Sequence, residues 1–426
     1  MGICELAKAA KAASIKLAVA DTKTKNAALA EIAKALEEKS AQIIAANEKD
    51  LAKAERGKLA APLLKRLKFD EKKISETVAG IKSLIKLGDP VGKTLSATQL
   101  DEGLELYKVA CPIGVIGVIF ESRPDALVQI STLCLKSGNA VLLKGGSEAA
   151  KTNAILAGVI SQASTNAGMP DGWIGLLETR QDVAEMLKLD DYIDLIIPRG
   201  SNEFVQHIMN NTNIPVLGHA EGLCHVYVDG RADVDMAVKI TVDSKCQYYA
   251  VCNAAETLLV DSKIAKQFLP RIRAVLEERE VEIRGCKRTR AIIKVKAATE
   301  KDWWTEYLDY ILSIKVVDGV DGAIEHINHY GSHHTDAIVT QNKASAERFL
   351  DLVDSAGVFW NCSTRFSDGY RYGLGAEVGI STNKIHARGP VGLEGLVIYK
   401  WKLIGTGQVV ADYAEGKKKF THKKIT

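Results

Sequence analysis

Cys252 is the residue whose chemistry is most easily named, because a cysteine thiolate is a strong nucleophile. It stands in the run Val251-Cys252-Asn253-Ala254-Ala255-Glu256-Thr257, directly before a β-rich stretch. A cysteine in such a place is commonly a small buried hydrophobe. A nucleophile would need a favoured thiolate and a nearby donor for an oxyanion. Asn253 and Glu256 give the segment polar character that a core cysteine does not require, and the residues alone leave both interpretations open.

Two strand-to-helix turns carry residues that could bind a phosphate. They are Lys144-Gly145-Gly146-Ser147 and Pro198-Arg199-Gly200-Ser201-Asn202. A helix that begins after such a turn offers free N–H groups and the positive end of its dipole. Each signal is weak alone, because a plain turn explains the first and a helix cap at Ser201 or Asn202 explains the second. The GxGxxG fingerprint of ordinary dinucleotide-binding folds is absent from the expected turn.

Two further groups could bind a ligand, and each has an ordinary structural explanation. The loop Gly373-Leu374-Gly375-Ala376-Glu377 is typical of a tight turn close to a ligand, and a purely structural turn is equally compatible. His326 and His329 lie on one predicted helix and could form a metal pair. No cysteine or carboxylate pair completes that site. We therefore expect solvated or core histidines and no metal.

The elements that must position these residues alternate between strand and helix after an all-helical start. This order predicts a parallel sheet covered by helices, which we expect to continue past residue 200. Residues 94–109 are predicted to form two strands around a turn at Asp101-Glu102-Gly103. The predicted helices are residues 8–20, 25–38, 40–55, 126–136, 148–165, 182–187, 233–240 and 263–278. The other predicted strands are 115–120, 140–143, 174–177, 195–197, 215–217, 224–228 and 257–260.

The composition excludes several classes of protein. The 426 residues suggest two or three domains, and the net charge of +3 does not indicate a nucleic-acid partner. The lysines at 417–419, 423 and 424 are expected to form a solvated tail. Eight scattered cysteines without a CxxC pair favour a reducing compartment. Residues 109–120, the longest apolar stretch, are too few to span a bilayer, so we expect a cytoplasmic protein without a membrane partner.

Taken in order along the chain, these motifs resemble those of the γ-glutamyl phosphate reductases, a branch of the aldehyde dehydrogenase superfamily. The resemblance covers nearly the whole chain, and the motifs together are highly specific although each is weak alone. They are Ala46-Asn47-Glu48-Lys49-Asp50-Leu51, 114–120, Glu121-Ser122-Arg123-Pro124-Asp125, 142–146, 197–201, Gly218-His219-Ala220-Glu221-Gly222, 252–257, Glu306-Tyr307-Leu308-Asp309, 334–340, 374–381 and His386-Ala387-Arg388-Gly389-Pro390.

The resemblance implies an aldehyde dehydrogenase-like α/β fold with a Rossmann-type cofactor domain, an α/β catalytic domain and a small oligomerisation hairpin. It implies that the cofactor-binding domain comprises residues 1–92 and 112–220. The catalytic domain would span 221–392, and the oligomerisation strands would be 93–111 and 393–426. The expected protein is a homo-oligomer that acts on a small-molecule substrate. A glutamate 5-kinase partner, if any, would be a separate chain.

The resemblance also implies a reaction, which belongs to proline biosynthesis. The Cys252 thiolate would attack L-glutamyl 5-phosphate, and phosphate would leave. Hydride from NADPH would then reduce the thioester to L-glutamate 5-semialdehyde. Ser147 stands where NAD-preferring relatives carry a Glu, which implies a preference for NADP. The implied catalytic residues are Cys252, Arg123 and Asn253, and the implied cofactor-binding residues are Lys144, Gly146, Ser147, Gly200, Ser201 and Glu306.

Two departures from the wider superfamily fit this direction of reaction. Ordinary aldehyde dehydrogenases carry a Glu that activates water for thioester hydrolysis, and this chain has His219 there. Arg123 replaces an oxyanion-binding Asn and could hold an oxyanion or the leaving phosphate with two hydrogen bonds. Tyr248-Tyr249-Ala250 and Tyr370-Arg371-Tyr372 depart from the reductase pattern, which leaves fine specificity open.

Two other functions are compatible with parts of this pattern. A CoA-acylating aldehyde dehydrogenase would share the cysteine and the missing Glu, but the 121–125 motif argues against it. A structural protein that has adopted an enzyme fold is disfavoured by the intact Cys252, Lys144 and Glu306.

Overall fold

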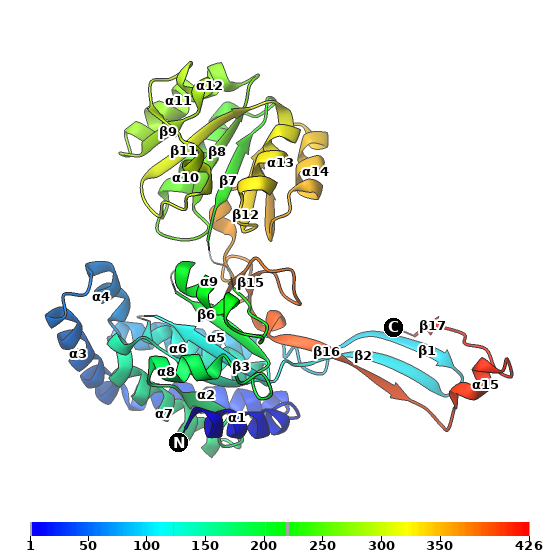
Figure 1. Cartoon of the computed structure of the whole chain (residues 1–426). Coiled ribbons are helices and arrows are strands. Elements are labelled where there is room, and N and C mark those ends of the chain that lie inside the picture. The colour runs from blue at the N-terminus through cyan, green and yellow to red at the C-terminus, as the bar shows by residue number, and fades with distance from the viewer. Residues whose placement is uncertain (1, 122, 201, 219–220, 426) are drawn as a thin grey trace.

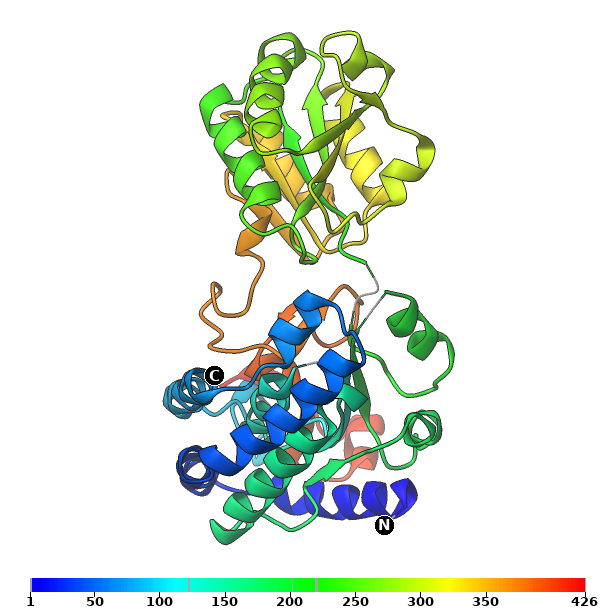
Figure 2. The ribbon, with the colours of Figure 1, turned by 90° about the vertical axis from the view of Figure 1, so that its left-hand side faces the viewer.

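The computed structural model describes residues 2–121, 123–200, 202–218 and 221–425. Figures 1 and 2 show a helix-covered α/β unit, a second α/β unit above it, and a long β arm that projects from the first unit. The chain passes from the first unit to the second between α9 and β7 and later returns, so that its last strands lie in the arm (Figure 1). This architecture agrees with the alternating strand and helix pattern of the sequence.

The N-terminal helices pack around the first sheet. Apolar residues recur with the period of an α-helix, so each helix has one buried face, which on α2 includes Leu29, Ile32 and Leu36. The Asp21 carboxylate accepts a hydrogen bond from the Thr24 N–H and so caps the start of α2. None of the helices in the described ranges is long and apolar enough to cross a bilayer. The bounds are α1 (Ile3–Leu17), α2 (Thr22–Glu38), α3 (Ser40–Arg56), α4 (Ala61–Leu67) and α5 (Glu71–Lys86).

The first sheet has four parallel strands in the order β5-β4-β3-β6. All residues of the central strand β3 are buried, as expected for a strand covered on both faces. The strands are β3 (Val115–Phe120), β4 (Ala140–Lys144), β5 (Ile174–Leu176) and β6 (Leu195–Arg199). The helices between and after them are α6 (Pro124–Lys136), η1 (Ser147–Ala149), α7 (Ala150–Asn166), α8 (Arg180–Met186) and α9 (Asn202–Asn210).

Two predictions about this sheet are wrong. Residues 215–217 form no strand and contribute only an isolated bridge between Ile196 and Val216. Pro215 has no N–H to donate, which limits the pairing to a few bonds. The sheet also does not continue past residue 200, because the strand at Cys224–Val228 is paired on both sides within a separate sheet.

That second sheet has seven parallel strands in the order β10-β9-β11-β8-β7-β12-β13. Helices lie on both of its faces (Figure 1). The strands are β7 (Cys224–Val228), β8 (Ala255–Asp261), β9 (Glu282–Gly285), β10 (Lys296–Ala297), β11 (Ile311–Val317), β12 (Thr335–Val339) and β13 (Gly357–Trp360). The helices are α10 (Val234–Cys246), α11 (Ala265–Glu277), α12 (Lys287–Arg290), η2 (Glu300–Trp304), α13 (Gly319–Tyr330) and α14 (Lys343–Leu352).

The chain returns from the second unit to the first through short elements that complete the first core. Val378, Val391 and Leu396 are buried together with the side chains of the first sheet. This return anchors the two units to each other at a second point. The elements are η3 (Thr364–Phe366), β14 (Gly379–Ser381), β15 (Gly389–Val391) and η4 (Leu393–Leu396).

The arm is an antiparallel sheet in the order β16-β2-β1-β17. The turn at Asp101-Glu102-Gly103 joins its first two strands as predicted, and β16 pairs with β2 along its full length. The lysine tail is not a free tail, because Lys423 and Lys424 pair with β1. The bounds are β1 (Thr94–Asp101), β2 (Leu104–Pro112), β16 (Val397–Ile404), α15 (Val410–Ala414) and β17 (Lys423–Lys424).

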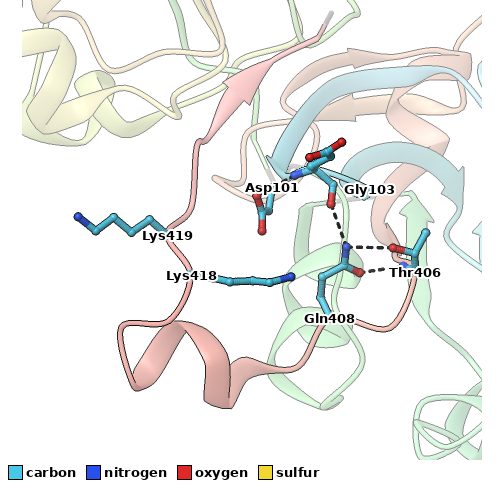
Figure 3. A pocket seen from close by; sticks show the side chains of 7 residues that line it. Asp101, Gly103, Thr406, Gln408, Lys418 and Lys419 are labelled. Carbon is cyan, nitrogen blue, oxygen red and sulfur yellow. Dashed lines mark hydrogen bonds between the residues drawn. The ribbon is translucent and has the colours of Figure 1, made fainter.

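A hollow of about 610 Å³ lies at the tip of the arm, between the β1–β2 turn and the C-terminal segment (Figure 3). The Gln408 side chain closes one side of it by donating to the Glu102 carbonyl at 2.9 Å and accepting from the Thr406 N–H at 2.7 Å. Lys418 and Lys419 line it opposite Asp101. None of the residues predicted to carry chemistry lies here, so these contacts hold the tip of the arm together.

A buried ion pair ties α10 to β8 beside the loop of Cys252. Lys245 Nζ lies 2.6 Å from Glu256 Oε2, and the two side chains are 0% and 1% exposed. Glu256 Oε1 also accepts from the Leu308 N–H at 3.2 Å. Burial raises the pKa of Glu256 to about 7, although the Lys245 ammonium opposes the rise. Glu256 therefore depends on Lys245 to remain charged within the core.

Replacing Lys245 with methionine should lower the free energy of unfolding by about 3–5 kcal/mol, because it leaves a buried carboxylate without its cation. Denaturant unfolding near neutral pH would measure the change. The double variant Lys245→Met with Glu256→Leu should recover part of the loss. A single variant as stable as the original chain would mean that the pair contributes nothing.

Candidate active site

A cavity of about 910 Å³ lies between the two units. The carboxyl ends of β3 and β6 in the first sheet face loops that precede β8 and β11 in the second sheet. Of the residues predicted from the sequence, the cavity brings together Cys252, Arg123, Gly200 and Glu306. In parallel α/β sheets, ligands bind beyond the carboxyl ends of the strands, so this is the expected place for a site.

Cys252 lies in the loop between α10 and β8 and is partly exposed to the cavity. Its backbone passes so close to Gly222 that a Cβ on that glycine would collide with the carbonyl oxygen, Cα and Cβ of Cys252. Burial raises the pKa of the Cys224 thiol well above its ordinary value, so it stays protonated and donates to the Cys252 carbonyl at 3.2 Å. These two contacts fix the backbone that carries the sulfur.

The side chain of Asn253, predicted to be catalytic, does not line the cavity. It is 5% exposed, and its amide donates to the Ser367 carbonyl at 2.8 Å. The Asn253 carbonyl in turn accepts from Thr364 Oγ1 at 2.7 Å. In this structure Asn253 therefore holds the cysteine loop against the segment around η3.

His334 is the contact of Cys252 that the sequence analysis missed. Its Nε2 lies 3.2 Å from Cys252 Sγ, and the histidine is fully buried at the start of β12. On the other side of the ring, Nδ1 lies 3.0 Å from Thr335 Oγ1 and 3.6 Å from Cys224 Sγ. The signal available was its place directly before a parallel strand within the 334–340 motif.

Two arginines bring positive charge to the cavity. Arg123 forms an ion pair with Asp125 at 2.9 Å. Burial alone would lower the pKa of Arg123, but Asp125 and then Glu377 outweigh it and raise the pKa. The pKa of Arg199 is lowered, first by burial and then by the neighbouring charge of Arg123. Among the described residues, Arg199 has no carboxylate within ion-pair distance, so an anion placed between the two guanidinium groups would be stabilised.

Glu306 lies on the loop that follows η2 and faces the same cavity. Its Oε2 accepts a hydrogen bond of 2.8 Å from Asn202 Nδ2 at the start of α9. Among the described residues, the other carboxylate oxygen accepts no hydrogen bond, which leaves an acceptor for a hydroxyl of a ligand. The family resemblance implies that Glu306 binds the cofactor. The structure adds that Asn202 orients the Glu306 carboxylate.

The strand-to-helix turn after β4 lies outside the lining of this cavity. Lys144 donates to the Gly145 carbonyl, and the Glu148 carboxylate occupies the space where a Cβ on Gly146 would lie. Ser147 is exposed, and neither η1 nor α7 has a side-chain cap. The turn therefore presents a hydroxyl and backbone groups at the end of β4, near the carboxyl edge of the sheet.

The remaining predictions concern other positions. Ser201 and His219 lie outside the described residues. His326 lies in the core on α13, where burial and then His225 and Lys315 lower its pKa to about 2, so it is neutral. In the described part of the chain, no group of histidine, cysteine, aspartate and glutamate side chains could hold a metal ion.

Comparison with known proteins agrees with this architecture. The aldehyde dehydrogenase family model matches residues 3–288. The chain is 66% identical to the gamma-glutamyl phosphate reductase of Pelotomaculum thermopropionicum, over 100% of this chain and 98% of that relative. It is 65% identical to the enzyme of the same name from Acetivibrio thermocellus, over 100% of this chain and 99% of that relative.

The crystal structure of the gamma-glutamyl phosphate reductase from Thermotoga maritima superimposes on this chain with a TM-score of 0.94 and 42% identity. The match covers 96% of this chain and 100% of that one. The predicted aldehyde dehydrogenase-like α/β fold is thereby confirmed. With a family model over most of its length and full-length relatives at high identity, the chain belongs to the aldehyde dehydrogenase family, in its gamma-glutamyl phosphate reductase branch.

Proposed function

We propose that this chain reduces L-glutamyl 5-phosphate to L-glutamate 5-semialdehyde with NADPH, through a thioester on Cys252. The observation that carries the proposal is a cysteine on the wall of a cavity that also contains Arg123 and Arg199. A thiolate can displace phosphate from an acyl phosphate, and paired guanidinium groups suit the departing dianion. The names of the full-length relatives support the same reaction rather than a CoA-acylating one.

In this proposal Cys252 acts on the acyl group, and Arg123 and Arg199 act on the leaving group. Cys252 attacks the acyl carbon, and the electron pair of the breaking carbon–oxygen bond leaves with phosphate. Arg123 and Arg199 hold that phosphate as its charge grows, which lowers the barrier because the donors are already in place. After reduction of the thioester, the thiohemiacetal on Cys252 collapses, which releases the aldehyde and restores the thiolate.

The cavity fits a nicotinamide cofactor, which supplies the hydride when bound. Gly200 lines the cavity, and a Cβ there would lie 2.9 Å from the Phe204 ring, so the backbone stays open to a ligand only with glycine. The Glu306 carboxylate offers an acceptor to ribose hydroxyls, oriented by Asn202. Lys144, Gly146 and Ser147 lie at the neighbouring strand end, where an adenosine phosphate would meet a lysine and a helix start.

Replacing Cys252 with alanine should abolish turnover while the protein remains folded, because no other group can form the thioester. The measurement is the reverse assay, in which glutamate 5-semialdehyde, NADP and phosphate yield NADPH. Cys246→Ala is the matched control, since burial raises the pKa of that thiol and it lies outside the cavity. Substantial activity in Cys252→Ala, or its loss in Cys246→Ala, would contradict the mechanism. Activity that does not depend on phosphate would contradict the proposed substrate.

Replacing Ser147 with glutamate should raise the Michaelis constant for NADPH more than tenfold and change that for NADH little. Two unit charges about 4 Å apart repel by roughly 4 kcal/mol at an effective dielectric of 20, which exceeds the 1.4 kcal/mol of a tenfold effect. Ser147 caps no helix, so the change should not disturb the turn. Ser147→Gln separates charge from size and should affect the two cofactors alike. An equal loss for both cofactors in Ser147→Glu would refute the preference for NADP.

The arm supports a homo-oligomer. Strand β16 lies on the edge of the arm sheet, and Trp401, Leu403 and Ile404 are 57%, 58% and 59% exposed. Tyr399 and Val410 are exposed on the same C-terminal segment. An edge strand with large apolar side chains is an aggregation hazard unless another chain covers it. A second copy of this chain could cover the exposed edge of β16, and it is always present at the same concentration as the first.

Sedimentation velocity at micromolar concentration should therefore find a dimer or larger assembly. Leu403→Asp, which introduces a charge into the covered face, should shift the distribution toward the monomer. Lys266→Asp on the exposed side of α11 is a charge-changing control that should leave the assembly intact. A monomer for the unmodified chain would refute the role of the arm.

A further inference from the structure

The proposed reaction needs a proton acceptor for Cys252 and, later, a proton donor. A thiol of ordinary pKa, about 8.5, is only a few per cent thiolate at neutral pH. The arginines of the cavity cannot accept a proton. Glu306 is turned toward Asn202. His334 is a described titratable side chain in direct contact with the sulfur, with Nε2 at 3.2 Å from Cys252 Sγ.

The other ring nitrogen of His334 has a partner that sets the protonation pattern. Thr335 Oγ1 lies 3.0 Å from Nδ1. In the tautomer in which Nδ1 carries the proton and donates it to Thr335, the lone pair of Nε2 is directed at Cys252 Sγ. The Cys224 thiol is a weaker neighbour of Nδ1 and is engaged with the Cys252 carbonyl. The imidazole is therefore placed as an acceptor for the S–H proton.

The backbone holds His334 rigidly in this place. Gly357 N–H donates to the His334 carbonyl at 3.0 Å, which joins the residue to the start of β13. His333, the preceding residue, has a φ of 61° and turns the chain into β12. The His334 ring is fully buried, and its backbone is held by the neighbouring parallel strand. Its side chain therefore has little room to move away from the sulfur.

We infer that His334 is the acid–base residue of Cys252, an assignment that rests on the proposed function. His334 Nε2 takes the S–H proton as the sulfur bonds to the acyl carbon, and phosphate departs with the electron pair of the broken carbon–oxygen bond. Hydride from the bound nicotinamide then adds to the thioester carbon, and the imidazolium proton neutralises the resulting oxyanion. When the thiohemiacetal collapses, its hydroxyl proton returns to the sulfur through His334, so that protons and electrons balance over the cycle.

The test uses the rate at which iodoacetamide alkylates Cys252 in the full-length protein without substrate. Peptide mass spectrometry assigns the label among the cysteines, and the rate is followed from about pH 6 to pH 10, across the ordinary thiol pKa. His334→Gln should slow alkylation of Cys252 about tenfold or more near pH 7 and move the midpoint of the pH profile upward. In turnover assays kcat should fall by a larger factor than KM rises.

The pH profile has known contributors besides His334. Arg199 and Arg365 act on the Cys252 charge, and Asp336 and Glu306 act on the neighbouring Cys224. None of them is changed in the variant, so a shift of the midpoint reports the loss of the imidazole. His326→Gln is the matched control, because His326 is also buried in the second unit but does not contact Cys252, and it should retain the original profile.

The outcomes separate the two proposals. An unchanged rate and midpoint in His334→Gln would overturn the inference, whatever the protein catalyses. The unmodified chain could form no semialdehyde while His334→Gln still slows the alkylation of Cys252. The proposed function would then be wrong, and the proton exchange between His334 and Cys252 would stand. Should His334→Gln fail to fold, Thr335→Val removes only the partner of Nδ1. That variant should slow alkylation several-fold, and an unchanged rate there would equally overturn the inference.

Discussion

The packing of the Cys252 backbone against Gly222 fixes the segment that carries the sulfur. No side chain fits at position 222, because the carbonyl and Cα of Cys252 already fill that space. The same loop is held by two hydrogen bonds of Asn253. Its carbonyl accepts from Thr364 Oγ1, and its side-chain amide donates to the Ser367 carbonyl. The sulfur is thus placed at a fixed point on the wall, and the buried imidazole of His334 can contact it only because this point does not move.

The charges around that point are consistent with the proposed acyl phosphate substrate. Arg123 is already paired with Asp125. Burial and then the charge of Arg123 lower the pKa of Arg199, so a nearby anion would stabilise its guanidinium group. In a partly desolvated cavity such an interaction is stronger than it would be in water. In the proposed reaction, guanidinium groups held in this way would stabilise a leaving dianion more than the unreacted acyl group. Glu306 accepts a hydrogen bond from Asn202 at the same cavity.

The sequence was sufficient for the elements and for most cavity residues, and insufficient for contacts between distant segments. Helical periodicity predicted α2 and α3 closely, and continuous apolar runs predicted β3 and β7, because these signals are local. The strand pattern alone did not divide the two sheets, because only pairing assigns β6 and β7 to different sheets. The division between residues 220 and 221 came from the family resemblance.

The site shows the same limit at the level of single residues. Cys252, Arg123, Gly200 and Glu306 were found through the order of motifs, and all four line one cavity. His334 is 82 positions from Cys252 along the chain, and no local pattern encodes which strand lies beside which loop. Asn253 shows the converse. Its neighbour Cys252 lines the cavity, whereas the Asn253 side chain donates a hydrogen bond to the Ser367 carbonyl.

The burial of His334 also bears on how the proposed thioester would survive until it is reduced. A general base exposed to the cavity could activate water, and the thioester would then be hydrolysed instead of reduced. His334 is fully buried and is not part of the cavity lining, so it can exchange a proton with the sulfur without contacting water in the cavity. The resemblance to the aldehyde dehydrogenases implies that His219 stands where hydrolytic relatives carry a glutamate. If His334 is the acid–base residue of Cys252, as proposed, these two features together would favour reduction of the proposed thioester over its hydrolysis.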